Sequence, residues 1–322
     1  MGNLISSIGE FGLIEKIKRQ LGNKIIGDDT APIIIGDETY LATCDILLED
    51  RHFLRSYPPE KIGFKAISVN VSDIVASGGK PIWVLVSLLL PDINISYVNK
   101  IYEGIKKACL YYHCQVIGGN ITSSEKIGID VFMIGKAKKF MGRSGAKIDD
   151  LVYTTGVLGD SKAGLELLLK KKKSYENFEK QLIKKHINPI INIKNSDYIS
   201  SFATSALDIS DGLSSDIFYL SNQSNVGIVI ESKKIPLSDS LLRFCKKYNY
   251  DPIDYSLSGG EDYEVLFTQN LKSLPAQAGE IRNPKKYFCI GKVVPKRGVW
   301  LDDKKLINKS FSHFLPVTKP PK

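Results

Sequence analysis

Aspartates inside apolar segments constrain this chain more than any other feature of its sequence. Asp45 interrupts the apolar stretch 40–48, and Asp73 shares a helical pattern with Val69 and Val75. Carboxylates in such surroundings lose hydration and repel one another, so they need cations between them. Four motifs carry these aspartates: Gly27-Asp28-Asp29, Thr43-Cys44-Asp45, Asn70-Val71-Ser72-Asp73 and Asp208-Ile209-Ser210-Asp211-Gly212. The sequence therefore predicts a cation site built from segments that lie far apart along the chain.

The available ligand types indicate magnesium at that site. Hard oxygen ligands without histidine or cysteine favour Mg²⁺, which usually bridges carboxylates to substrate phosphates. The five cysteines contain no C-x-x-C pair and the four histidines are isolated, so a zinc site is not expected. Any one aspartate could be only a helix cap or a turn residue, and this alternative weakens when four motifs are taken together.

Helical and strand patterns alternate irregularly and predict an α+β protein of two domains, each with a mixed sheet covered by helices. Residues 60–79 are expected to form a helix, 82–90 a buried strand, and Ser96 is expected to cap a second helix. The polar segment 143–150 predicts the boundary between domains 1–142 and 143–322. Further strands are expected at 31–35, 40–48, 115–117, 127–133, 151–155, 206–209, 227–231, 263–268 and 288–294, and a further helix after 159–161.

Several functional classes are disfavoured by absent patterns. No G-x-x-x-x-G-K-[ST] loop and no G-x-G-x-x-G turn occurs, which argues against a P-loop kinase and a dinucleotide dehydrogenase. The pairs Gly118-Gly119 and Gly259-Gly260 are more informative, because glycine lets backbone N–H groups approach phosphate oxygens. Either pair could also be an ordinary turn.

Charge, cysteine content and hydropathy indicate a cytoplasmic protein that binds neither nucleic acid nor membrane. The net charge of +9 comes from scattered lysines, with a single run at 170–173 and no interleaved aromatics. The longest apolar run, 82–90, falls far short of the roughly 20 residues that span a bilayer. An odd number of scattered cysteines fits a reducing compartment, and no secretory signal is expected.

In their order along the chain, the motifs resemble those of the thiamine-monophosphate kinase family, within the aminoimidazole-ribonucleotide-synthase-like superfamily. Beyond the four aspartate motifs, the resemblance includes His52-Phe53, Lys65-Ala66, Ile117-Gly118-Gly119, Arg143-Ser144-Gly145-Ala146-Lys147, Thr155-Gly156, Leu158-Gly159-Asp160-Ser161 and Ser258-Gly259-Gly260-Glu261-Asp262-Tyr263-Glu264. It runs from Glu10 to Phe314. The arginine motif, the Gly259–Glu264 run and the aromatic near His313-Phe314 point to the kinase rather than to its superfamily neighbours.

The resemblance implies an N-terminal mixed-sheet domain for dimerisation and ATP binding, and a C-terminal α/β sandwich. It implies a homodimer that uses ATP and several Mg²⁺ ions to convert thiamine monophosphate to thiamine diphosphate. The implied metal ligands are Asp29, Asp45, Asp73, Asp208 and Asp211, flanked by Thr43 and Cys44. The implied ATP contacts are Tyr102, Gly119, Asn120, Arg143 and Ser210. The implied substrate contacts are His52, Glu261 and Phe311, and the implied catalytic groups are Asp45, Asp73, Arg143 and Asp211.

Charge explains the expected chemistry. The γ-phosphoryl group and the accepting phosphate are both anionic, so Mg²⁺ and Arg143 are expected to neutralise them during direct in-line transfer. A phosphate oxygen is already deprotonated at neutral pH, so no strong general base is required.

The chain departs from the family pattern at Asn120, where aspartate is usual, at Cys44, where a hydroxyl residue is usual, and after His186, where an arginine is often found. We expect a weaker metal position at Asn120, because an amide brings no charge. The alternatives are another enzyme of the superfamily, a non-catalytic nucleotide-binding protein or a basic nucleic-acid binder.

Overall fold

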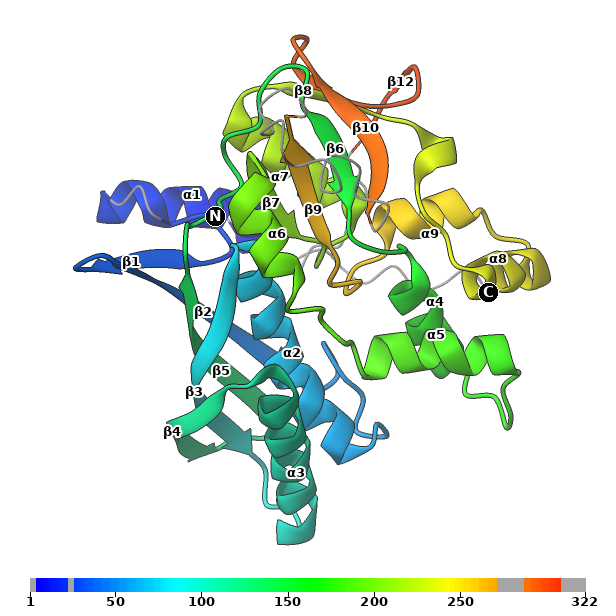
Figure 1. Ribbon diagram of the computed structural model, residues 1–322. Helices are drawn as coiled ribbons and strands as arrows, with labels where there is room; N and C mark the ends of the chain where they lie inside the picture. Colours follow the sequence, from blue (N-terminus) through cyan, green and yellow to red (C-terminus); the bar gives the residue numbers. More distant parts are fainter. Residues whose placement is uncertain (1–3, 23–25, 271–286, 308–322) are drawn as a thin grey trace.

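The computed structural model describes residues 4–22, 26–270 and 287–307. Their strands form two separate sheets joined by helices (Figure 1). The N-terminal sheet has the order β1-β2-β5-β3-β4, and the C-terminal sheet has the order β12-β11-β8-β10-β6-β9-β7. Both sheets mix parallel and antiparallel pairs, since β3 runs parallel to β4 and β8 parallel to β11. The predicted α+β class with two mixed sheets is confirmed.

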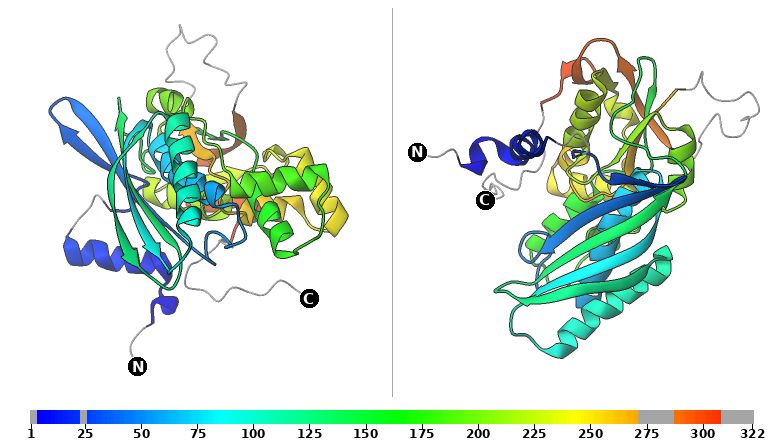
Figure 2. Two further views of the ribbon diagram at one scale, coloured as in Figure 1. Left: turned by 90° about the horizontal axis from the view of Figure 1, so that it is seen from below. Right: turned by 90° about the vertical axis from the view of Figure 1, so that its left-hand side faces the viewer.

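The N-terminal sheet is covered by helices on one face. Its strands are β1 (Ala31–Ile35), β2 (Glu38–Leu48), β3 (Gly79–Leu90), β4 (Gln115–Ser123) and β5 (Gly128–Ala137). Side chains alternate along β2 and β3, so that Leu41, Leu47 and Val84 are buried. Helices α2 (Pro59–Ala76) and α3 (Ile95–Tyr112) cover this buried face, while the strands themselves face the viewer in the right-hand view of Figure 2.

Helices α2 and α3 cross where each carries a glycine. A Cβ atom on Gly63 would lie 2.0 Å from the carbonyl oxygen of Ile101, and one on Gly104 would lie 1.9 Å from that of Glu60. The two backbones can approach this closely only without side chains at these positions. The cap of α3 differs from expectation: the side chain of Asn94 accepts a hydrogen bond from the backbone N–H of Ser96, so Asn94 is the capping residue.

In the described residues, the C-terminal part begins with β6 and combines one sheet with six helices, of which α4, α5 and α8 pack on one another. The strands are β6 (Leu151–Thr154), β7 (Ser205–Asp208), β8 (Gly227–Ile230), β9 (Val265–Gln269), β10 (Phe288–Val294), β11 (Gly298–Leu301) and β12 (Lys304–Lys305). The helices are α4 (Asp160–Leu169), α5 (Asn177–Ile187), α6 (Asn195–Phe202), α7 (Leu213–Ser224), α8 (Asp239–Tyr248) and α9 (Pro252–Ser258). Helix α1 (Gly9–Leu21) and the short 3-10 turns Ile5–Ser7 and Ser232–Lys234 complete the described elements.

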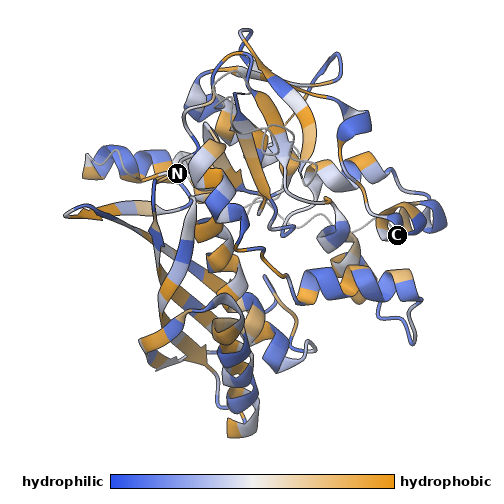
Figure 3. Ribbon diagram, viewed as in Figure 1, coloured by the Kyte–Doolittle hydropathy of each residue, from blue (hydrophilic) through white to orange (hydrophobic). Residues whose placement is uncertain are grey.

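A continuous hydrophobic core links the two sheets through α2. It extends from Val84 in β3, past Ile67 of α2, to Tyr153 and Phe267 of the C-terminal sheet. In Figure 3 the strands of both sheets carry many hydrophobic residues along this path. Helix α2 is therefore enclosed between the two halves of the molecule.

No described helix combines the length and apolarity needed to cross a membrane.

Expected boundaries are wrong at two places. Helix α2 ends at Ala76 and β3 begins at Gly79, whereas the helix was expected to extend to 79 and the strand to begin at 82. Gly118-Gly119 was expected to follow a strand, but it lies within β4, which pairs with β3 over its length. A Cβ on Gly119 would lie 1.9 Å from the carbonyl oxygen of Val86, so this glycine allows the strands to pair closely.

Candidate active site

Three aspartates from distant segments meet at the junction of the two sheets. Asp29 precedes β1, Asp73 belongs to α2 and Asp208 ends β7. One carboxylate oxygen of each lies within 4.8 Å of the other two. The backbone N–H of Asp208 also donates to Asp29 Oδ2 at 3.2 Å. The structure thus brings together three of the five expected metal ligands.

Burial and mutual repulsion act strongly on these carboxylates. Burial raises the pKa of Asp73 well above its usual range, and the charges of Asp45, Asp208 and Asp29 raise it further. The pKa of Asp208 is raised for the same two reasons, by burial and then by Asp29, although Arg143 opposes the shift. Asp45 is therefore close enough to act on both groups. These buried carboxylates repel one another unless a cation lies between them, and such a set of oxygen donors fits the coordination chemistry of Mg²⁺.

Arg143 places a positively charged guanidinium beside the aspartates. Its Nε donates to Asp29 Oδ1 at 2.8 Å, and its Nη2 also pairs with that oxygen. Its backbone N–H donates to both oxygens of Asp28 at 3.1 Å. Its guanidinium lies 5.7 Å from the ring centre of Tyr219. Arg143 therefore ties the segment after the N-terminal sheet to the Gly27-Asp28-Asp29 motif.

Hydroxyl groups orient two of the carboxylates. Thr43 Oγ1 donates to Asp73 Oδ2 at 2.6 Å, and Ser72 Oγ donates to Asp208 Oδ2 at 2.8 Å. Thr43 and Asp45 share one face of β2 because side chains alternate along a strand. Cys44 consequently lies on the opposite face, where its Sγ is 3.3 Å from Asp130 Oδ1. Ser72 was not expected as a site residue, although its position directly before Asp73 could have suggested it.

Three expected nucleotide contacts lie apart from the aspartates within this chain. Asn120 is on β4, which β5 and β3 separate from β2, a distance of three inter-strand steps or about 14 Å. Its Oδ1 accepts a hydrogen bond from the backbone N–H of Ile121 at 2.9 Å. Gly119 precedes it on the same strand, and Tyr102 is partly exposed on α3. The predicted roles of these residues stay predictions.

The turn after β7 holds Ser210 and Asp211 beside the cluster. The carbonyl oxygen of Ser210 accepts from the backbone N–H of Glu261 at 2.7 Å. A further aspartate, Asp216, was missed: its Oδ2 accepts from the backbone N–H of Gly212 at 3.0 Å. Burial raises the pKa of Asp216 well above its usual range, and Asp211 adds to the shift. The spacing of Asp216 from Asp211 and Gly212 at the start of α7 is the signal that could have revealed it.

Glu261 lies in a second polar group between the two halves. Its carboxylate pairs with Lys65 of α2 at 2.8 Å and approaches His186 of α5 at 3.2 Å. The carbonyl oxygen of His52 accepts from Lys65 Nζ at 3.2 Å, which places His52 beside the group. Of the expected substrate contacts, His52 and Glu261 are thus neighbours of one lysine. Phe311, like His313 and Phe314, lies outside the described residues.

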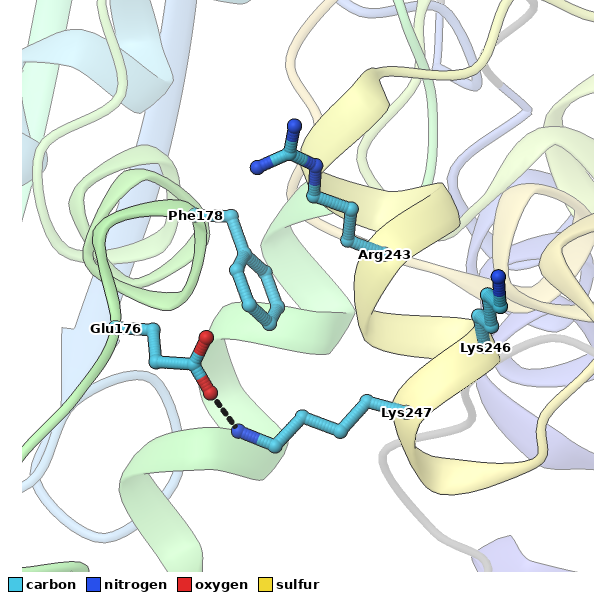
Figure 4. A pocket seen from close by; sticks show the side chains of 5 residues that line it. All are labelled: Glu176, Phe178, Arg243, Lys246 and Lys247. Atoms are coloured by element: carbon cyan, nitrogen blue, oxygen red, sulfur yellow. Dashed lines mark hydrogen bonds and ion pairs between the residues drawn. The ribbon is translucent and has the colours of Figure 1, made fainter.

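Surface cavities in the described part of the chain include one between α5 and α8 and one beside the arginine motif. One of about 440 Å³ is lined by Glu176, Phe178, Arg243, Lys246 and Lys247, on α5, α8 and the residue before α5 (Figure 4). Lys247 pairs there with Glu176 and, at 3.1 Å, with Glu179. The other cavity, of about 410 Å³, lies next to the arginine motif and is lined by Lys139, Phe140, Met141, Gly142, Ser144, Gly145, Lys147, Ala203 and Thr204.

The chain is similar to known proteins over nearly its whole length. Residues 27–137 match the family described as AIR synthase related protein, N-terminal domain. The thiamine-monophosphate kinase of Aquifex aeolicus is 49% identical over 312 residues, covering 96% of this chain and 99% of that protein. The kinase of Escherichia coli K12 is 35% identical, covering 88% and 90%.

A solved structure described as AaThiL complexed with AMPPCP and TMP superposes with a TM-score of 0.92 at 48% identity. The superposition covers 97% of this chain and 99% of that one. The sequence is 49% identical to a thiamine-monophosphate kinase over nearly its full length, and the aspartate motifs and the two-sheet fold agree with that match. The chain therefore belongs to the thiamine-monophosphate kinase family.

Proposed function

We propose that this protein transfers the γ-phosphoryl group of ATP directly to thiamine monophosphate, giving thiamine diphosphate and ADP in thiamine diphosphate biosynthesis. The observation that carries the proposal is the buried cluster of Asp29, Asp73 and Asp208, paired with Arg143, in a chain 49% identical to a thiamine-monophosphate kinase. The related structure in complex with AMPPCP and TMP supports the choice of both substrates.

The aspartates would hold several Mg²⁺ ions, with Asp29, Asp73 and Asp208 as ligands and Asp45 and Asp211 beside them. When bound, the ions would neutralise phosphate oxygens of the two anionic substrates. Arg143 offers a planar set of N–H donors that matches phosphate as well as it matches the carboxylate of Asp29. Neutral Asn120 contributes no charge to this balance.

The proposed reaction needs no general base from the chain. The accepting phosphate oxygen carries no proton at neutral pH, so it needs positioning rather than a base. This requirement agrees with His186, whose pKa burial lowers to about 3, leaving it neutral. It also agrees with the oxygen-only cluster, where Thr43 and Ser72 orient carboxylates instead of moving protons.

The uncovered face of the N-terminal sheet supports a homodimer. Ile46, Trp83 and Leu85 are exposed on this face, and Tyr40 stacks on Trp83 with 6.4 Å between ring centres. A large exposed apolar face commonly marks an interface. We infer that a second copy covers it, and we place the dimer in the cytoplasm, which the free thiols of the chain support.

Ile46→Lys should therefore convert the dimer to a monomer, because a lysine in an apolar interface must lose its hydration. Sedimentation velocity measures the change. Ile190→Lys, at an exposed isoleucine outside the N-terminal sheet, is the matched control and should leave the dimer intact. A wild-type protein that sediments as a monomer at micromolar concentration would contradict the dimer.

Phosphorus NMR of purified protein with ATP, Mg²⁺ and thiamine monophosphate tests the activity. We expect thiamine diphosphate and ADP to appear together, and both to be lost in Asp45→Ala, because Asp45 lies beside the charged cluster. ATP binding without product in the wild-type protein would exclude the kinase reaction and favour a non-catalytic nucleotide binder.

A further inference from the structure

Lys65 is a buried cation in the middle of α2. Its side chain is 1% exposed, and its Nζ lies 2.8 Å from Glu261 Oε1 and 3.2 Å from the carbonyl oxygen of His52. A buried ammonium without acceptors is strongly destabilising, so the position of Lys65 depends on these two oxygens. In return, Lys65 holds one oxygen of Glu261 and the backbone of His52, the two described residues that the family resemblance assigns to the substrate.

His186 lies against the other oxygen of Glu261. Its Nδ1 is 3.2 Å from Glu261 Oε2 and 3.0 Å from Ser161 Oγ, and its Nε2 is 2.9 Å from the hydroxyl of Tyr57. A lone pair on Nδ1 would be repelled by an ionised carboxylate 3.2 Å away, so we infer that Nδ1 carries the imidazole hydrogen, which Ser161 Oγ accepts at 3.0 Å. Nε2 then accepts, and the hydroxyl of Tyr57 donates to it. This network fixes both the tautomer and the ring orientation of His186.

Glu261 has a strained backbone, and its side chain stays partly exposed to solvent although it has these partners. Its φ of 63° lies in the left-handed region that side chains rarely adopt, and its N–H donates to the carbonyl oxygen of Ser210 at 2.7 Å. Burial alone would raise its pKa, but the charge and hydrogen bond of Lys65 hold that pKa below the usual range. The side chain is still 22% exposed. The exposed edge of the carboxylate is the part that a ligand can reach.

We propose that Lys65 and His186 are positioning residues, which hold the carboxylate of Glu261 from two sides so that it can bind the thiamine portion of the acceptor. The proposal rests on the proposed function. A fixed carboxylate suits the cationic ring or the amino group of thiamine, each of which is attracted to or donates to an anion. Because Lys65 and Tyr57 come from the N-terminal half and His186 and Glu261 from the C-terminal half, the acceptor site exists only when the halves are docked.

Two histidine variants separate the positioning role from packing. In His186→Asn the amide nitrogen takes the place of Nδ1 and keeps an N–H donor beside Glu261. In His186→Gln the amide takes the place of Nε2 and leaves Glu261 without that donor. Both variants remove the imidazole ring, so a packing effect would be similar in the two. We expect His186→Gln to raise the KM for thiamine monophosphate about tenfold more than His186→Asn, with the KM for ATP within twofold of the wild type.

The lysine variants supply the second measurement. Lys65→Met should raise the KM for thiamine monophosphate at least tenfold, and Lys65→Arg should restore part of the loss because it keeps a cation. Lys172→Met, which breaks the ion pair with buried Glu179 away from Glu261, is the matched control and should leave both KM values unchanged. Thermal unfolding of every variant identifies any that fail to fold, and calorimetric titration of thiamine monophosphate confirms the KM changes as changes in binding.

The outcomes are distinguishable. Equal KM values for His186→Asn and His186→Gln, or a parallel rise in the KM for both substrates, would overturn the positioning role while leaving the kinase intact. A wild-type protein that forms no thiamine diphosphate would instead overturn the proposed function, and the inference with it.

Discussion

Asp73→Asn should lower kcat by about a thousandfold or more while making the magnesium-free protein more resistant to heat. The loss follows from the removal of one anionic ligand, because metal ions contribute several kcal/mol to transition-state stabilisation and about 4 kcal/mol corresponds to a thousandfold in rate. The gain in thermal resistance follows from burial and from repulsion by Asp45, Asp208 and Asp29, which oppose a charge on this side chain. An asparagine oxygen can still accept from Thr43 Oγ1.

The two effects are measured by steady-state assay and by thermal unfolding at pH 8 with a chelator present. Asp197→Asn is the control, because that aspartate is exposed and pairs with Lys80 at 2.8 Å away from the cluster; it should change neither quantity. A thermal midpoint that falls in Asp73→Asn without Mg²⁺ would show that the aspartate is structural rather than held in place for a cation.

Gly104→Ala should destabilise the protein by about 3 kcal/mol or more, the upper range for overpacking a buried contact. The new methyl group would meet the carbonyl oxygen of Glu60 at 1.9 Å, and backbone atoms cannot move aside as a side chain can. Helices α2 and α3 would have to separate, and α2 carries Lys65 and Asp73. Urea unfolding monitored by circular dichroism measures the change.

Glu103→Ala provides the comparison, since its exposed side chain lies one residue away on α3 and its loss should change stability by no more than about 0.5 kcal/mol. Equal stability of Gly104→Ala and the wild type would show that the crossing of the two helices tolerates a side chain, contrary to the structure.

The aspartate site was predictable because its signal is local. A carboxylate inside an apolar strand or helix is recognisable in the sequence without knowledge of its partners, and Asp29, Asp73 and Asp208 do meet. Strand alternation also carries information about Cys44, which lies on the face of β2 opposite to Thr43. Asn120 shows the limit of such reasoning, since its place depends on the strand order of the sheet and no local pattern encodes that order.

The polar group around Glu261 could not be predicted in the same way. Lys65 in a helix is ordinarily read as a surface residue, and His186 as an isolated histidine. Their roles arise only when α2 and α5 pack against the loop that carries Glu261, which brings together residues separated by more than a hundred positions. Buried pairs of this kind depend on tertiary contacts, and single-sequence patterns contain no information about those contacts.

Helix α2 sets the distance between the aspartate cluster and the proposed acceptor site at Glu261. Lys65 and Asp73 are eight residues apart on one continuous helix, which corresponds to about 12 Å along its axis. The phosphate acceptor must therefore be long enough to place its phosphate at the aspartates while its other end reaches Glu261. We therefore expect a short monophosphate to reach one end only, so that acceptors are selected by their length as well as by their chemistry.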